Sequence, residues 1–155
     1  MDTYTYMNSQ QEPMLIFKVP RDKVWILHSA YTFRFNSPAG YFEIIIPKGF
    51  EYDLASIPRF LWSMIAPFEL SAVAPLFHDY MYKNVGQVPI MHETDELRFF
   101  KGFTRKDADI LFNQIMMAED VVFWKRVLAY KAVRVFGGGV WNKTLKYRRK
   151  KKGAA

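Results

Sequence analysis

Residues 49–82 read GFEYDLASIPRFLWSMIAPFELSAVAPLFHDYMY, and the chain changes character across this stretch. Before it, apolar and polar residues alternate as they do in strands, and after it the apolar residues recur at helical spacing. The stretch also holds most of the side chains suited to site chemistry in a chain without cysteine, namely Asp53, Ser56, His78 and Asp79. It therefore marks the strand-to-helix boundary and is the first place to look for a functional site.

Length and composition favour one folded domain. The chain has 155 residues, of which 50% are apolar, which is enough for one core and too little for two of ordinary size. The absence of cysteine excludes disulfides, thiolate zinc sites and cysteine nucleophiles. No basic region followed by an apolar core opens the sequence, so we expect no secretion by a signal peptide. The apolar run at 60–77 is broken by Pro67, Glu69 and Pro75, so we expect no membrane span.

The formal charge of +7 is concentrated at the C-terminus. Seven of the 22 Lys and Arg residues lie there: Lys143, Lys146, Arg148, Arg149, Lys150, Lys151 and Lys152. The remaining 15 basic residues balance 15 acidic ones, so the sequence predicts a neutral domain at 1–142 and a basic tail at 143–155. Such a tail is attracted to an acidic surface of a larger assembly or, without reading base sequence, to nucleic acid. One nearby aromatic residue, Tyr147, offers little stacking surface for single strands.

The first third of the chain predicts antiparallel strands. Residues 31–35 alternate aromatic and polar side chains with a period of two, which is typical of a strand with one buried face. A polar cluster at 36–40 predicts a turn, and the β-branched run at 41–46 predicts the returning strand of a hairpin. A second turn is expected at 47–49, followed by a short strand through Tyr52.

Two shorter segments follow. Ser56 is expected to cap a helix start with Pro58 in its first turn, leading into a buried helical turn or two over 60–65. Residues 71–83 predict a helix that tolerates Pro75 in its first turn. We then expect a loop at 84–91 and a charged surface excursion at 92–98.

Two helices are predicted in the C-terminal half. Thr104 and Asp107 have the spacing of a capping box, and Asp109 adjoins the apolar stripe of the helix that follows. A second helix is expected after 119–120 and is predicted to end at the three glycines 137–139. Its predicted inward side chains are Trp124, Leu128, Ala132 and Val135, and a polar line is formed by Arg126, Tyr130 and Arg134.

This order of elements predicts an α+β fold. Strands come first and helices after, which favours N-terminal antiparallel strands and hairpins packed against three to four C-terminal helices. No glycine-rich phosphate loop follows a strand in the sequence, which argues against a nucleotide-binding enzyme fold.

Four motifs give the chain a family resemblance. They are G-F-x-Y-D-L-A-S-I-P-R-x-L-W at 49–62, H-D-Y-x-Y at 78–82, R-x-x-A-D-x-L-F at 105–112 and A-Y-x-A-V-R-x-F-G at 129–137. In order and spacing, the chain over about residues 40–141 resembles the uncharacterised phage and prophage family catalogued as domain of unknown function 1353. The resemblance carries no established activity. It implies a bacteriophage origin, hence the host cytoplasm during infection and the virion as locations, and its motif positions fall here on Asp53, Ser56, His78, Asp79 and Asp109.

These five residues allow three interpretations. As metal ligands, Asp53, His78, Asp79 and Asp109 suit a divalent Zn, Mn or Fe ion that activates water. As a nucleophile, Ser56 would be activated by His78 and oriented by Asp53 or Asp79, although no Gly-x-Ser-x-Gly motif surrounds it. As structural groups, Ser56 caps a helix, Asp53 and Asp109 accept backbone amides, and His78 is a core imidazole bonded to one of them.

Two functions follow as expectations. The first is a small virion component of the tail or its adaptor region, whose aromatic surface and basic tail bind other phage structural proteins. The second is a metal-dependent hydrolase acting on phosphoester or cell-wall substrates through Asp53, His78, Asp79 and Asp109. The geometric discriminator is whether these carboxylates and a His78 nitrogen converge beside an open cleft.

Overall fold

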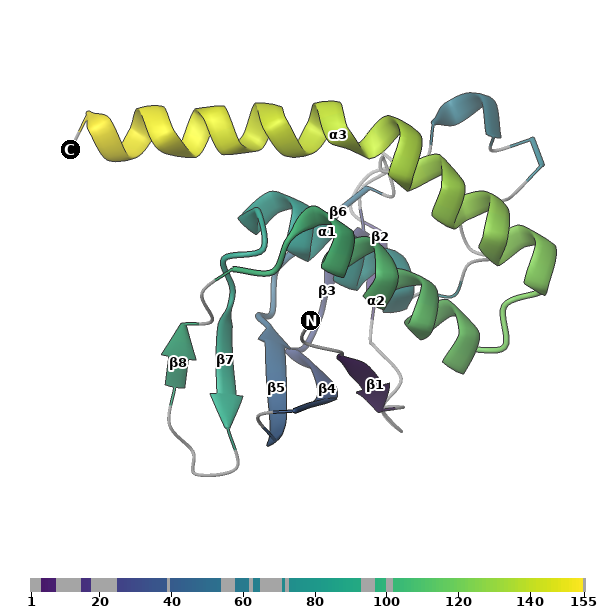
Figure 1. Ribbon diagram of the computed structural model, residues 1–155, viewed down its shortest axis with the longest axis horizontal. Helices are drawn as coiled ribbons and strands as arrows, with labels where there is room; N and C mark the ends of the chain where they lie inside the picture. Colours follow the sequence, from purple (N-terminus) through teal and green to yellow (C-terminus); the bar gives the residue numbers. More distant parts are fainter. Residues whose placement is uncertain are drawn as a thin grey trace.

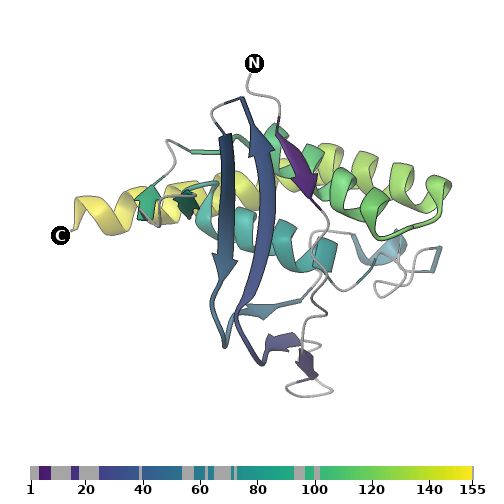
Figure 2. The same ribbon diagram turned by 90° about the horizontal axis from the view of Figure 1, so that it is seen from below.

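A computed structural model describes residues 4–7, 15–17, 25–38, 40–53, 58–61, 63–64, 71, 73–92, 97–99 and 102–154. Strands form one side of the described molecule and helices the other, with α3 outermost (Figure 1). Seen from below, the long strands β4 and β5 cross in front of the helices, so the helices cover one face of the sheet (Figure 2). The α+β class predicted from the sequence is confirmed.

The described strands form two antiparallel sheets. The larger has the order β1-β4-β5-β7-β8 and consists of β1 (Thr5–Met7), β4 (Tyr31–Ser37), β5 (Gly40–Ile46), β7 (Pro89–His92) and β8 (Leu97–Phe99). The smaller has the order β2-β3-β6 and consists of β2 (Leu15–Phe17), β3 (Trp25–Leu27) and β6 (Glu51–Tyr52). A short 3₁₀ turn η1 (Arg59–Leu61) precedes the helices α1 (Val73–Asn84), α2 (Arg105–Ala118) and α3 (Phe123–Gly153).

The hairpin of β4 and β5 is the centre of the larger sheet. Its register runs from Tyr31 opposite Ile46 to Ser37 opposite Gly40, which confirms the hairpin predicted over 31–46. Phe33 and Phe35 point to the buried face, where the ring of Phe77 on α1 lies 5.1 Å from the first and 5.4 Å from the second. Aromatic contacts of this kind hold α1 against the sheet.

The predicted loop at 84–91 and surface excursion at 92–98 are wrong in part. Pro89 opens strand β7, which pairs with β5, and β8 pairs with β7 in turn. Proline is acceptable here because it is the first residue of the strand. Val88 and Ile90 are buried, so a segment whose glycine and proline indicated a loop contributes to the core. Residues 93–96 lie outside the described part of the chain.

The segment after β6 differs from the buried turn predicted at 60–65. Leu61 is buried, but Phe60 is 65% exposed and Met64 is 56% exposed. Phe60 instead packs edge to face on Phe136 of α3, with 5.7 Å between ring centroids. The helix cap predicted at Ser56 lies outside the described residues.

Helix α3 continues through the three glycines where it was predicted to end. At Gly137 the glycine permits a close helix contact instead of ending the helix. A Cβ added to Gly137 would lie 2.5 Å from the hydroxyl oxygen of Tyr82, so α3 approaches α1 at a distance that glycine permits. In Figure 1 the helix changes direction partway along its length, which is common where glycines weaken a helix.

The buried face of α3 is also rotated from the predicted one. Its buried residues are Ala129, Ala132, Val133, Gly137 and Trp141, whereas Trp124 is 50% exposed and Val135 is 71% exposed. Ala129, Ala132 and Gly137 on this face are small, and Gly137 lets α3 lie close to Tyr82 of α1. Of the predicted inward residues, Ala132 is buried and Leu128 is partly buried. None of the described helices has the length and apolar character needed to cross a bilayer.

Alanine substitutions of the glycines distinguish the effect of packing on stability from the effect of helix propensity. Gly137→Ala should destabilise the protein by roughly 1–3 kcal/mol, because the new methyl overpacks against a buried Tyr82. Gly139→Ala is the matched control, since a Cβ there meets no described atom within 4 Å and alanine favours a helix interior by about 0.5–1 kcal/mol. Urea unfolding followed by circular dichroism measures both changes. Equal effects of the two substitutions would contradict the close approach of α3 to α1.

Candidate functional site

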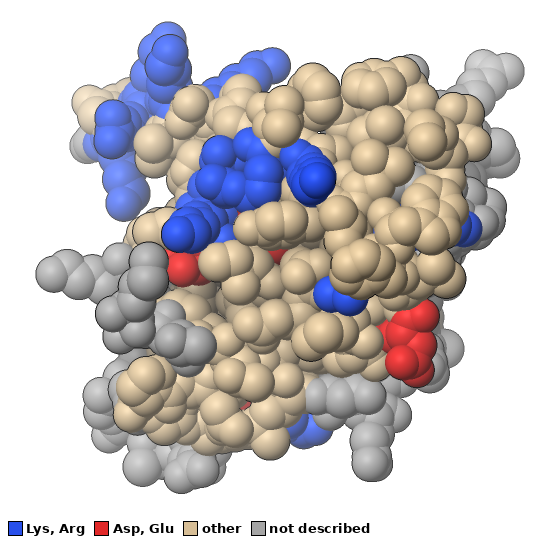
Figure 3. Space-filling view, turned by 45° about the vertical axis from the view of Figure 1, so that its right-hand side comes forward, with Lys and Arg blue, Asp and Glu red and all other residues tan. Residues whose placement is uncertain are grey.

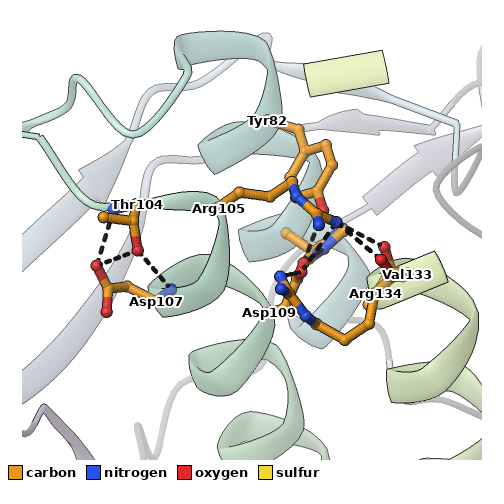
Figure 4. A network of polar contacts seen from close by, with 8 residues as sticks. Tyr82, Thr104, Arg105, Asp107, Asp109, Val133 and Arg134 are labelled. Atoms are coloured by element: carbon orange, nitrogen blue, oxygen red, sulfur yellow. Dashed lines mark hydrogen bonds and ion pairs between the residues drawn. The ribbon is translucent and has the colours of Figure 1, made fainter. Parts of the chain in front are cut away.

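The site is built around the carboxylate of Asp109, which is 0% exposed. Asp109 lies near the start of α2, where the predicted capping box is confirmed. The Thr104 amide donates to Asp107 Oδ2 at 2.8 Å, and the Asp107 amide donates to Thr104 Oγ1 at 3.1 Å (Figure 4). These bonds fix where α2 begins. The start of the helix in turn points Asp109 inward, as its place beside the apolar stripe predicted.

Donors from all three helices converge on this carboxylate (Figure 4). On Oδ1 it accepts a hydrogen bond from His78 Nε2 at 2.8 Å and another from the Tyr82 hydroxyl at 2.7 Å. On Oδ2 it accepts one from Arg134 Nη1 at 2.6 Å, and Arg105 Nη1 forms a longer ion pair at 3.6 Å. Arg105 also donates to the backbone carbonyls of Val133 and Arg134, so it ties α2 to α3 as well. Both carboxylate oxygens are therefore satisfied.

The electrostatics follow from this arrangement. Burial alone would raise the pKa of Asp109, but hydrogen bonds from His78, Tyr82 and Arg134 outweigh it, and the pKa lies below its ordinary value. Burial and the bond to Asp109 raise the pKa of the Tyr82 hydroxyl. The bond to Asp109 likewise raises the pKa of Arg134. The network therefore holds a carboxylate and a guanidinium in their charged forms.

The two ring nitrogens of His78 differ in their contacts with the described residues. Because a carboxylate can only accept, the proton of this hydrogen bond is assigned to Nε2. Nδ1 is buried and has no hydrogen-bond partner among the described residues. The imidazole lies 4.1 Å from the ring of Tyr82 and 4.6 Å from that of Phe112, measured between centroids. An imidazole held by a carboxylate through one nitrogen is the arrangement in which the other nitrogen serves as a base or a metal ligand.

Asp79 faces a different element from its neighbour. Its Oδ2 accepts a hydrogen bond from the backbone amide of Asp53 at 3.2 Å, just after strand β6. Burial and, second to it, the charge of Asp79 raise the pKa of Tyr52 in the same strand. His78 therefore joins α1 to α2, and Asp79 joins α1 to the smaller sheet. The divergence expected for consecutive residues on a helix explains the split.

The predicted site residues thus meet as two pairs. His78 and Asp109 are bonded directly, and Asp79 meets Asp53 through a backbone amide of the latter. Ser56 lies outside the described residues, so its predicted roles stay predictions. Within the part of the chain that the structure describes, no three His, Asp or Glu side chains form a group that could hold a metal ion.

Three partners of Asp109 were not among the predicted site residues. Arg105 precedes Asp109 by four positions on α2, a spacing that places two side chains on one helix face and could have indicated an ion pair. Tyr82 closes the H-D-Y-x-Y motif, and Arg134 belongs to the polar line noted on the last helix. Which of these polar residues meet at Asp109 depends on helix packing, which spacing along the chain does not give.

The described residues define an α+β protein in which α1, α2 and α3 are fixed around one buried carboxylate. The chain belongs to the family described as "Protein of unknown function (DUF1353)", which matches residues 25–133. This range includes Asp53, His78, Asp79 and Asp109 and ends before the basic C-terminal residues. No curated protein and no solved structure matches the chain.

The network makes stability depend on pH with a defined sign. Because the folded-state pKa of Asp109 is lowered, its contribution is complete above the unfolded value of about 3.9 and is lost as the pH falls further. Asp109→Asn should cost about 2–4 kcal/mol at neutral pH, since it removes the negative charge that faces Arg134 and Arg105 and replaces one of the two acceptor oxygens by an NH2 donor. The difference from wild type should shrink below about pH 4.

Chemical denaturation across pH measures this difference. Asp120→Asn is a matched control, because Asp120 is exposed and its left-handed backbone suits asparagine equally well. The control should unfold like wild type. A difference between Asp109→Asn and wild type that stays constant down to the lowest pH would contradict a lowered pKa.

Proposed function

We propose that the protein is a small structural component of a bacteriophage particle, located in the tail or its adaptor region, that binds partner chains. The observation that carries the proposal is the fully bonded, fully buried state of Asp109. A carboxylate with both oxygens engaged by protein donors serves to hold helices together rather than to contact a substrate. The family resemblance supports the phage origin.

The exposed apolar side chains of α3 supply the contact surface. Val135, Phe136 and Val140 are exposed near the middle of the helix, and Phe60 packs beside Phe136. Single exposed apolar residues are ordinary, but a group that includes paired aromatic rings is typical of a protein contact. Asp109 fixes α3 on the other two helices, so this surface is held ready for a partner chain.

Mass spectrometry of particles purified from the encoding phage tests the proposal. The protein should be present in stoichiometric amounts with the tail proteins. Val135→Asp should reduce its incorporation by about tenfold or more, because it places a charge in the contact. Met117→Asp is the control, since Met117 is also exposed but lies on α2 and not on α3. Absence of the wild-type protein from purified particles would contradict the proposal.

One observation favours the alternative, a metal-dependent hydrolase. Nδ1 of His78 has no hydrogen-bond partner among the described residues, and Nε2 is bonded to Asp109, which matches the way carboxylates orient histidines that bind metals. The ligands proposed from the sequence are Asp53, His78, Asp79 and Asp109, for Zn, Mn or Fe, with a phosphoester or cell-wall substrate.

Elemental analysis of the native protein tests this alternative. It predicts about one equivalent of metal per chain, and His78→Gln should lose most of it. Asp120→Asn should retain the metal, because Asp120 lies in an exposed turn. Metal at only a small fraction of one equivalent in the wild type, purified without chelators, would count against a hydrolase.

A further inference from the structure

The end of α3 carries a concentration of charge that the Asp109 network does not use. The basic segment, residues 143–152, contains seven cations and no acidic residue. One of them, Arg148, is engaged: its Nη1 donates to the backbone carbonyl of Asn84 at 2.7 Å, and its Nη2 donates to the Asn84 side chain at 3.0 Å. The other six are exposed: Lys143, Lys146, Arg149, Lys150, Lys151 and Lys152.

The basic segment is helical and anchored. Trp141 is buried against the ring of Tyr82, Leu145 packs on the core, and Arg148 holds the end of α1. Beyond these contacts α3 extends past the body of the molecule (Figure 1). Lys and Arg side chains gather along the upper left of the face in Figure 3, where α3 runs. The cations are thus presented on an ordered backbone, which lowers the entropic cost of binding.

The directions of the cations identify the partner. Successive residues of a helix are about 100° apart, so the four consecutive cations from Arg149 to Lys152 surround the last turn. Lys143 and Lys146 extend the positive charge along the outer side of the helix. A flat acidic protein surface would reach only one side of this turn. A groove with anions on both walls can contact the cations on several sides of this turn at once.

We propose that the last turn of α3 enters the major groove of duplex nucleic acid, with its cations on the phosphates of both walls. The major groove of B-form DNA is about 12 Å wide and admits an α-helix. A bilayer surface fits less well, since Tyr147 is the one large apolar residue exposed in the basic segment. Lysines contact phosphate as point charges, so binding does not depend on base sequence.

Stabilisation of the helix end does not account for all of these residues. Lysines in a last turn do interact favourably with the C-terminal carbonyls, and Lys150, Lys151 and Lys152 are so placed. That effect fades within one turn, and Lys143 and Lys146 lie further from the end. The inference goes beyond the proposed virion role and stands on the charges of α3 alone.

Fluorescence anisotropy with the full chain and a labelled duplex of about 20 base pairs tests the inference. With five to six phosphate contacts, the logarithm of the binding constant should fall against that of the salt concentration with a slope of about −5. Duplexes of unrelated sequence should bind equally. Polyglutamate and phosphatidylserine vesicles serve as anionic competitors, and each should compete far less well than unlabelled duplex.

Paired charge reversals test the two-walled contact. Lys143→Glu with Lys150→Glu alters the outer side of the helix, and Lys151→Glu with Lys152→Glu alters the remaining sides. Lys106→Glu with Lys131→Glu is the matched control, since both lysines are exposed outside the basic segment and each pair takes the net charge from +7 to +3. Each segment pair should weaken duplex binding by roughly 10- to 100-fold at about 0.1 M salt, and the control by less than about threefold.

The outcomes are distinct. Loss of affinity from the outer pair alone would overturn groove insertion, because it would show that the duplex contacts only one side of the helix. Tighter binding to vesicles or polyglutamate than to duplex would overturn it in favour of that partner class. An equal loss of duplex affinity from all three pairs would also overturn groove insertion, because net charge alone would then account for binding. Circular dichroism confirms that each variant is folded, and particle mass spectrometry reports on the virion role separately.

Discussion

The position of the helices depends on one buried charge. Asp109 lies on α2, and its carboxylate is bonded to His78 and Tyr82 of α1 and to Arg134 of α3. A carboxylate without donors in this interior would be unfavourable by several kcal/mol. Each helix must therefore bring its donor to the same point. Few relative positions of α1, α2 and α3 satisfy this condition, so the network selects one packing among those that apolar contacts alone would allow.

The same condition sets the register of α3 along α1. The Tyr82 hydroxyl that donates to Asp109 also lies against Gly137, so the glycine is needed where the network places the tyrosine. Three turns further on, Arg148 binds the last residue of α1. The interface between α1 and α3 therefore contains three successive contacts: the Asp109 network, Gly137 against Tyr82, and Arg148 bonded to Asn84. Together they fix the direction in which the basic end of α3 leaves the molecule.

Sequence reasoning succeeded where local rules are sufficient. The alternation at Tyr31, Phe33 and Phe35 and the pairing of Thr104 with Asp107 depend on neighbours in the chain, and both are confirmed. It failed where tertiary contacts override local preference. Gly137 was assigned to a helix end by its propensity, but its role is to admit Tyr82. For the site, proximity of His78 to Asp109 was anticipated, whereas Arg134 required the helix packing itself.

The role of the His78–Asp109 pair depends on whether a substrate or metal can reach the imidazole. The pair has the bonding of an oriented base or ligand, yet the imidazole is fully buried beside aromatic rings. Because His78 is fully buried between α1 and α2, Nδ1 could reach a substrate only if these helices moved apart. The same movement would stretch the bonds from His78 and Tyr82 to Asp109 that hold the helices together. Catalysis and scaffolding thus make opposite demands on one residue, and the full set of donors on Asp109 favours the scaffold.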